Sequence, residues 1–247
     1  MAIRNVKLTI GYDGVNYKGW QSQPGRRTIQ GELERAISEL TGWLTKVNGA
    51  SRTDAGVSAL GQVANFLIES PIPTENLVKA INHRLPRDIF VSEAVEVEPS
   101  FDASGSAKNK LYRYKIFTGR KRNVLQSRNC WHRPGELDVA AMDAAAKMLV
   151  GTFDFKSFAS AADKRETSVR TVMRCDVAQE EKWVSIEIEA DRFLYNMVRN
   201  IVGTLVETGR GRWKPEKIKE ILEAKNRTAA GPIAPPEGLC LVHINYD

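Results

Sequence analysis

Residues 51–66 read SRTDAGVSALGQVANF and join two predicted strands. A short apolar run precedes them, and from Gln62 to Ile68 the sequence alternates as a half-buried strand does. Asp54 and Gly56 suit the connection between the strands, because Asp can bond its own backbone and Gly tolerates positive φ. Taken alone, the four residues Arg52–Ala55 fit a surface turn with a structural Arg–Asp pair.

On both sides of this stretch, the apolar residues of the first part of the chain recur with the period of a strand in some segments and of a helix in others. The predicted elements are a strand at 5–12, a helix that begins after the N-cap Thr28 and stops at Gly42, a helix at 74–85 ended by Pro86, and a strand at 88–97. Together with the two strands around the central stretch, these elements give the order β-α-β-β-α-β.

The second part of the chain repeats this order. Residues 98–109 are rich in small and polar side chains, so we expect domains at 1–104 and 105–247. The predicted elements are strands at 110–117, 172–179, 183–189 and 239–244, helices at 138–150 and 192–208, and a short helix from Pro215. The predicted class is therefore α+β, with two ferredoxin-like subdomains whose antiparallel sheets meet across a central cleft.

The composition is that of a globular protein. Of 247 residues, 42% are hydrophobic and 27% charged, and no apolar run approaches the length of a membrane span. The cysteines and histidines are widely separated, and no Cys-x-x-Cys pair occurs, so no zinc or other metal site is expected. Idle thiols fit a reducing cytoplasm, without contact to a membrane.

The net charge of +6 favours a polyanionic partner. The basic residues gather in three clusters: Arg120, Lys121, Arg122, Arg128 and Arg133; Lys164, Arg165, Arg170 and Arg174; Arg210, Arg212 and Lys214. Trp131 and Trp213 lie among them, as aromatic residues do on RNA-binding surfaces. A single cluster fits a solvated face equally well, whereas three of them favour nucleic acid.

The sequence ASRTDAGVSALGQVANF at 50–66 resembles the signature of the tRNA pseudouridine synthase A family. The usual family form is GRTDAGVHA, followed by GQ and an apolar strand. The resemblance implies the pseudouridine synthase fold and makes Asp54 the catalytic nucleophile. It also implies that Arg52 helps to displace the target nucleotide and binds its phosphate.

Arg199 lies in the predicted helix at 192–208, within the sequence MVRNIVG. Apolar residues cover most of this helix, so its arginine needs a partner or water. From the pattern alone, the side chain equally fits an arginine that reaches out to solvent. The sequence again resembles the family, in which this arginine pairs with the nucleophilic carboxylate, here Asp54.

Tyr112 lies in the sequence LYRY at the start of the second part. A tyrosine on a strand is commonly a packing residue. The Y-R-Y sequence resembles the family at the tyrosine that stacks on the target uracil, which implies this role for Tyr112. Tyr114 points to the same side of the strand and takes the role if the alignment shifts by two residues.

The chain departs from the usual family pattern beside the site residues. Ser51 and Ser58 replace a glycine and a histidine, and Tyr195-Asn196 replaces a basic or histidine pair. These changes leave Asp54 and Arg199 in place and bear on which nucleotide is favoured. Shorter matches, among them GYDG at 11–14 and LPRD at 85–88, extend the resemblance over nearly the whole chain.

The resemblance implies a cofactor-free isomerase that converts uridine to pseudouridine at tRNA positions 38 to 40 and acts as a homodimer. Attack of Asp54 on uracil C6 and attack on ribose C1′ both remain open. Two other functions are alternatives: a non-catalytic RNA-binding protein, and a two-carboxylate hydrolase of glycosidic bonds. The RNA-recognition-motif signature is absent, and Asp13 and Glu69 show no evident pairing with Asp54 in the sequence.

Overall fold

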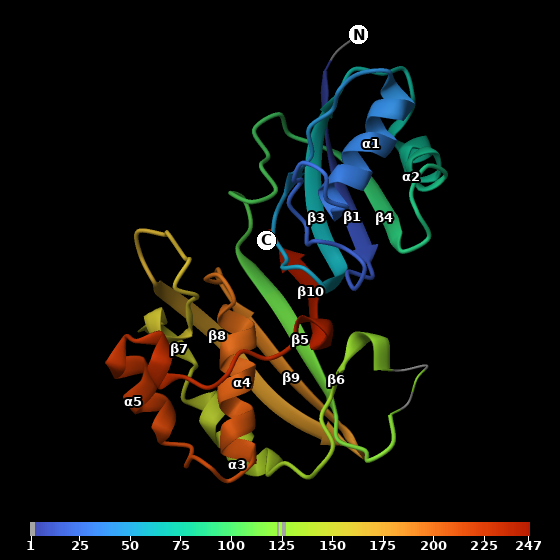
Figure 1. Ribbon diagram of the computed structural model, residues 1–247. Coiled ribbons are helices and arrows are strands. Elements are labelled where there is room, and N and C mark those ends of the chain that lie inside the picture. Colours follow the sequence, from blue (N-terminus) through green and yellow to red (C-terminus); the bar gives the residue numbers. More distant parts are fainter. Residues whose placement is uncertain (1–2, 123, 125–126) are drawn as a thin grey trace. The chain divides into compact units, whose positions relative to one another are not determined.

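The chain forms two compact units in the computed structural model, which describes residues 3–122, 124 and 127–247. The first unit comprises Met1–Lys108 and Leu241–Asp247, and the second comprises Asn109–Cys240. Figure 1 shows the chain coloured from its N-terminus to its C-terminus. The end of the chain thus belongs to the unit in which the chain begins.

The first unit is an antiparallel sheet with two helices. Its elements are β1 (Arg4–Tyr12), α1 (Ile29–Thr41), β2 (Asn48–Gly49), β3 (Ser58–Ile68), α2 (Thr74–Asn82), β4 (Ile89–Val97) and the larger part of β10 (Leu239–Asn245). The strand order is β4-β1-β3-β10, β2 also pairs with β3, and β1 is antiparallel to both β3 and β4. The order of elements from β1 to β4 is that of a ferredoxin-like unit.

The core of this unit lies between the sheet and its helices. Val6, Leu8 and Ile10 alternate along β1 and are fully buried, as are Leu33 and Ile37 of α1. At its two ends, α1 is capped as the sequence predicts: Oγ1 of Thr28 accepts a hydrogen bond from the amide of Gly31, and Gly42 adopts a φ of 79°. The predicted bounds of this helix are therefore confirmed.

The second helix ends earlier than predicted. The sequence predicts helix as far as Leu85, whereas α2 ends at Asn82. The amide side chain of Asn82 bonds both the N–H and the C=O of Val91 in β4, at 2.8 Å each. These two hydrogen bonds tie the end of the helix to the sheet. In addition, a residue that precedes a proline, here Leu85, disfavours the helical conformation.

The second unit is a further antiparallel sheet with helices. Its elements are β5 (Asn109–Phe117), β6 (Trp131–His132), α3 (Val139–Lys147), β7 (Gly151–Asp154), β8 (Val169–Glu180), β9 (Trp183–Ala190), α4 (Met197–Gly209) and α5 (Lys217–Ala224). The strand order is β5-β9-β8-β7, with antiparallel pairing throughout, and the short β6 runs parallel to β5. The predicted α+β class with antiparallel sheets is confirmed, although β6 and β7 were not predicted.

The helix that carries Arg199 begins later than predicted. The sequence predicts helix from Arg192, whereas α4 begins at Met197. The N–H of Tyr195 donates to Oδ2 of Asp163 at 2.6 Å, and its carbonyl accepts from Ser160 at 2.9 Å. Asn196 then adopts a left-handed φ of 62°, so Tyr195 is held in a loop and the helix starts after it.

Among the described residues, no helix has both the length and the apolar character that a bilayer span requires.

Candidate active site

Asp54 lies in the loop between β2 and β3, and Gln62 holds the start of this loop. The fully buried side chain of Gln62 donates to the carbonyl of Ser51 at 2.6 Å and accepts from its N–H at 3.1 Å. The N–H of Ala50 donates to the carbonyl of Val63 at 2.8 Å. The loop therefore leaves the sheet at a fixed point next to Arg52, whose side chain is exposed.

Thr53 fixes the backbone directly before Asp54. Its carbonyl accepts a hydrogen bond from the N–H of Trp20 at 3.0 Å, and its hydroxyl lies 2.8 Å from the hydroxyl of Tyr12. Thr53 is buried, whereas Asp54 is half-buried. Because both backbone and side chain of Thr53 are bonded, the main chain at Asp54 has little freedom.

Glycines allow a neighbouring loop to pack against residues 53–57. Gly19 has a φ of +88°, and a Cβ atom there would lie 2.7 Å from the carbonyl oxygen of Thr53. A Cβ atom at Gly14 would lie 1.9 Å from the carbonyl oxygen of Val57. Only glycine permits such close approach of two backbones. Asp54 is thus a half-buried carboxylate on a tightly packed loop of the first unit.

Arg199 lies in the first turn of α4, in the second unit. Its Nε donates to the carbonyl of Ala234 at 2.9 Å, and its Nη1 donates to Oδ1 of Asn196 at 3.1 Å. The N–H of Ala234 donates back to the carbonyl of Arg199 at 3.1 Å. The guanidinium is half-buried and fixed by these bonds.

The segment that receives Arg199 is itself packed against α4. A Cβ atom at Gly203 would lie 1.7 Å from the carbonyl oxygen of Pro232, and the N–H of Gly231 donates to Oγ1 of Thr204 at 3.0 Å. The segment 231–234 therefore follows the helix closely and presents the Ala234 carbonyl to Arg199.

Tyr112 and Tyr114 share one side of β5 but have different surroundings. The ring of Tyr112 is 6% exposed and packs edge-on against Phe193, with 5.1 Å between the ring centroids. Tyr114 is fully buried, and its hydroxyl donates to the carbonyl of Pro235 at 2.7 Å. Burial raises the pKa of Tyr114, so this hydroxyl stays protonated and bonded. Tyr114 therefore has a structural role, which favours Tyr112 as the base-stacking candidate.

Lys110 lies on the same side of β5, two residues before Tyr112. Burial, together with the positive charges of Arg192 and Arg165, lowers the pKa of Lys110 to about 8. In the sequence, only the two-residue spacing from Tyr112 on a predicted strand indicates that Lys110 lies beside it.

We expect the free energy of unfolding of Lys110→Met, relative to that of wild type, to be higher at pH 7 than at pH 10. The pKa in the folded protein, about 8, lies below the ordinary value of 10.5. Between these values the unfolded chain binds more protons, so wild-type stability rises with pH, and the free energy of unfolding of the variant relative to wild type falls. Urea unfolding at pH 7 and pH 10 measures this difference, with Lys115→Met, an exposed lysine of the same strand, as the control. A difference in the free energy of unfolding between variant and wild type that is the same at pH 7 and pH 10 would contradict this prediction.

The basic clusters differ in how far carboxylates neutralise them. Arg174 lies within 3.6 Å of carboxylate oxygens of Asp176, Glu187 and Glu189. Arg210 and Arg212 both pair with the buried Glu207, at 3.0 and 2.8 Å. In contrast, Arg120 and Lys121 are exposed and form no ion pair with any residue that the structure describes. Arg120, Lys121 and the adjacent exposed Arg122 therefore offer positive charge to a polyanion.

Within the ranges that the structure describes, no set of three or more His, Cys, Asp or Glu side chains is arranged to hold a metal ion. The buried Cys175 has a pKa raised to about 12 by burial, so it stays a thiol.

The chain belongs to the family described as tRNA pseudouridine synthase, whose profile matches residues 9–104 and 145–247. A tRNA pseudouridine synthase A from Acetivibrio thermocellus is 47% identical over 244 residues, which are 99% of this chain and 100% of that protein. Proteins of the same name from Caldicellulosiruptor saccharolyticus and Anoxybacillus flavithermus are 45% and 47% identical, each with 99% of this chain and 100% of theirs covered. The family resemblance noted in the sequence is confirmed.

Among solved structures, a chain of a Cbf5-Nop10-Gar1 complex aligns with 95% of this chain and 57% of its own length. The TM-score is 0.39 and the sequence identity is 12%.

Proposed function

We propose that this protein isomerises uridine to pseudouridine in tRNA, with Asp54 as the nucleophile. The observation that carries the proposal is the loop at Asp54: a half-buried carboxylate on a backbone bonded at Thr53 and closely packed by Gly19. A nucleophile needs such fixed placement, because small displacements of a reacting group cost large factors in rate. Membership of the family supplies the reaction.

The reaction conserves the atoms of the substrate. The bond between uracil N1 and ribose C1′ breaks, the base turns, and C1′ bonds to C5. The hydrogen on C5 leaves as a proton, and N1 gains one. Asp54 forms a temporary covalent bond to the base or to the sugar and is released unchanged, so no oxidant, hydride donor or water is consumed.

We assign the remaining site residues by the same proposal. Arg199 would pair with the carboxylate of Asp54 and keep it charged, which its fixed guanidinium supports. Tyr112 would stack on the target uracil, and Arg52 would hold the phosphate of the displaced nucleotide. The exposure of Arg52, beside a pinned nucleophile loop, supports its role.

The target and the assembly state belong to the proposal as well. We assign tRNA positions 38 to 40 as the substrate sites, next to the anticodon loop, where unpairing a base is least costly. The protein would act as a homodimer in the cytoplasm without a cofactor, and would be the tRNA pseudouridine(38-40) synthase of its cell. Mapping of pseudouridine along tRNA treated with the protein tests which positions are modified. Analytical ultracentrifugation of the protein tests whether it is a dimer.

Mass spectrometry of RNA treated with the protein tests the reaction itself. Isomerisation leaves the mass of unmodified tRNA unchanged and converts uridine to pseudouridine in the nucleoside digest. Hydrolysis of the glycosidic bond would release uracil, and an RNA-binding protein would leave the nucleosides as they were. Either of the last two results would overturn the proposed function.

The exposed basic segment 120–122 should supply phosphate contacts to tRNA. Because each contact releases counterions, log affinity should fall with log salt by about 0.7–0.9 per contact. Replacing Arg120, Lys121 and Arg122 together by glutamine should reduce this slope by about 2. Filter binding across salt concentrations measures it, with Arg174→Gln as the control, because three carboxylates already surround Arg174. An unchanged slope in the triple variant would remove this segment from the RNA footprint.

A further inference from the structure

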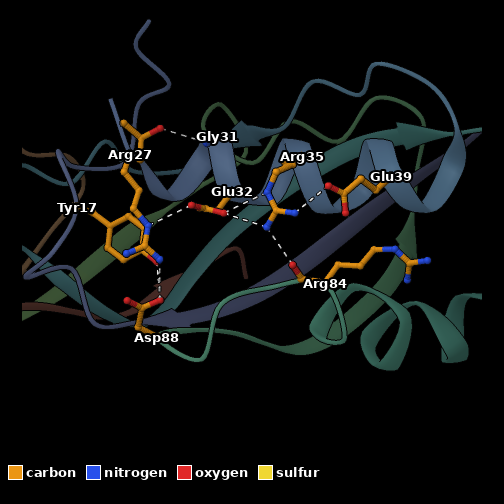
Figure 2. Close-up of polar contacts among 9 residues, drawn as sticks. Tyr17, Arg27, Gly31, Glu32, Arg35, Glu39, Arg84 and Asp88 are labelled. Atoms are coloured by element: carbon orange, nitrogen blue, oxygen red, sulfur yellow. Dashed lines mark hydrogen bonds and ion pairs between the residues drawn. The ribbon is translucent and has the colours of Figure 1, made fainter. Parts of the chain in front are cut away.

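Three side chains form a clamp on the first unit, consisting of Tyr17, Arg27 and Asp88 (Figure 2). The ring of Tyr17 is 2% exposed, and its hydroxyl donates to Oδ1 of Asp88 at 2.5 Å. The guanidinium of Arg27 lies over the ring, 4.5 Å from its centroid, and 3.6 Å from Oδ1 of Asp88. The tyrosine is therefore held at its hydroxyl and on one face of its ring.

The backbone of Tyr17 contacts the loop of Asp54. Its carbonyl accepts a hydrogen bond from the N–H of Gly56 at 3.3 Å. Three residues later, the N–H of Trp20 donates to the carbonyl of Thr53 at 3.0 Å. The segment from Tyr17 to Trp20 thus bonds the nucleophile loop on both sides of Asp54.

Asp88 is anchored to the sheet. Its carbonyl accepts from the N–H of Asp13 at 3.0 Å, and the next residue, Ile89, begins β4 opposite Tyr12 of β1. The clamp therefore connects a rigid sheet edge to Tyr17, and through Tyr17 to the loop. The sequence motifs GYDG and LPRD, which the proposed reaction leaves without a role, supply Asp13 and Asp88.

Further ion pairs support the clamp from α1. Nε of Arg27 bonds Glu32 at 3.1 Å, and Glu32 also bonds Arg35 at 3.0 Å. Arg35 in turn donates to the carbonyl of Arg84 at 3.0 Å, in the turn before Asp88 (Figure 2). Burial and the carboxylate of Asp88 raise the pKa of Tyr17, so its hydroxyl remains a donor throughout the assay range.

We propose that Tyr17 and Asp88 are positioning residues for the nucleophile, and that their hydrogen bond sets the place of the Asp54 loop. This inference rests on the proposed function. Neither residue takes part in bond making. Their effect acts through the backbone bond from Gly56 to Tyr17, and it should change the rate of the chemical step without changing tRNA binding.

Tyr17→Phe tests the inference, since it removes one hydroxyl and keeps the ring under Arg27. We expect kcat to fall about 10-fold, with KM and tRNA affinity within about 2-fold of wild type. Asp88→Asn keeps an oxygen acceptor at the same place and should retain most of the rate, whereas Asp88→Ala should lose as much as Tyr17→Phe. The double variant Tyr17→Phe/Asp88→Ala should be no slower than either single variant, because both remove one interaction.

Tyr246→Phe provides the matched control. Its hydroxyl donates to the carbonyl of Ala103 at 2.7 Å in the same unit, in a bond that does not involve the Asp54 loop. Thermal unfolding of both variants compares the loss of stability, and kcat of Tyr246→Phe should equal that of wild type. The inference is wrong if Tyr17→Phe keeps the kcat of wild type, or if it raises KM and leaves kcat unchanged. It is also wrong if the kcat of Tyr17→Phe falls no further than that of Tyr246→Phe. Should Tyr17→Phe not fold, the contrast between Asp88→Asn and Asp88→Ala decides in its place. An inactive wild type would instead overturn the proposed function.

Discussion

Asp54→Asn should abolish the release of tritium from tRNA that carries 5-tritiated uridine. The substitution keeps the size of the side chain and most of its hydrogen-bonding capacity, but removes the charge that attacks. A missing nucleophile has no substitute in a covalent mechanism, so we expect a loss on the order of 10⁴-fold or more. Binding of tRNA should stay within a few-fold, because contacts to phosphates dominate that affinity.

Tritium release reports on the completed isomerisation. The hydrogen on C5 leaves only when C5 takes the place of N1 on the ribose, so binding and base extrusion release no label. Attack on uracil C6 and attack on ribose C1′ both require the carboxylate, and the prediction therefore holds for either. Wild-type protein should release the label without added metal or nucleotide.

Asp102→Asn provides a control with the same chemical change in the same unit. The carboxylate of Asp102 accepts hydrogen bonds from the N–H of Gly105 at 2.6 Å and from the side chain of Asn48 at 2.5 Å, in a turn outside the Asp54 loop. Its activity should equal that of wild type. If Asp54→Asn turned over at a comparable rate, Asp54 would be a turn residue and the assignment of the nucleophile would be wrong.

The sequence predicts periodic elements well and their ends less well. The alternation along β1 and the capping residues of α1 are local signals, and the structure confirms both. In contrast, α2 and α4 deviate from prediction where one side chain bonds a distant segment. Asn82 bonds Val91, and Asp163 bonds Tyr195, over separations that no local pattern reveals.

The family resemblance predicts individual site residues, whereas no pattern in the sequence predicts the contacts that hold them in place. The resemblance identifies Asp54, Arg199 and Tyr112, and their roles stay predictions until variants are tested. Charge spacing also fails to show which basic residues are neutralised: Arg174 of β8 pairs with Glu187 and Glu189 of the neighbouring strand β9. Pairing across strands depends on tertiary packing, so the structure, rather than the spacing of charges, shows that Arg174 is neutralised and that Arg120 and Lys121 pair with no carboxylate among the described residues.

The support of the Asp54 loop comes from residues far apart in the sequence. Gln62 bonds Ser51 across the start of the loop, while Tyr17 reaches it from the preceding connection. A glutamine or tyrosine at such a position has no pattern that indicates a partner. In the sequence, Gly14 and Gly19 indicate turns. The close approach of their backbone to residues 53–57 is seen only in the structure.

Arg199→Leu should reduce turnover by on the order of 10²–10³-fold while the protein stays folded. In the proposed site, Arg199 supplies the positive charge that keeps Asp54 ionised. Without it, the protonated carboxyl is favoured and cannot attack. The activity of this variant should therefore rise as pH increases from 6 to 8.5, relative to wild type measured under the same conditions.

Two further variants separate the charge of Arg199 from its packing. Arg199→Lys keeps a positive charge but lacks the planar fork that reaches both Ala234 and Asn196, so it should recover part of the rate. Asn196→Ala removes the partner of Nη1 and leaves the guanidinium bonded to the carbonyl of Ala234, so its rate should stay within a few-fold of wild type. The backbone bond from Ala234 to Arg199 remains in all three, which preserves the packing of segment 231–234 on α4. A normal rate for Arg199→Leu would make Arg199 a packing residue, and equal losses in the Leu and Lys variants with no dependence on pH would show that its charge does not act on Asp54.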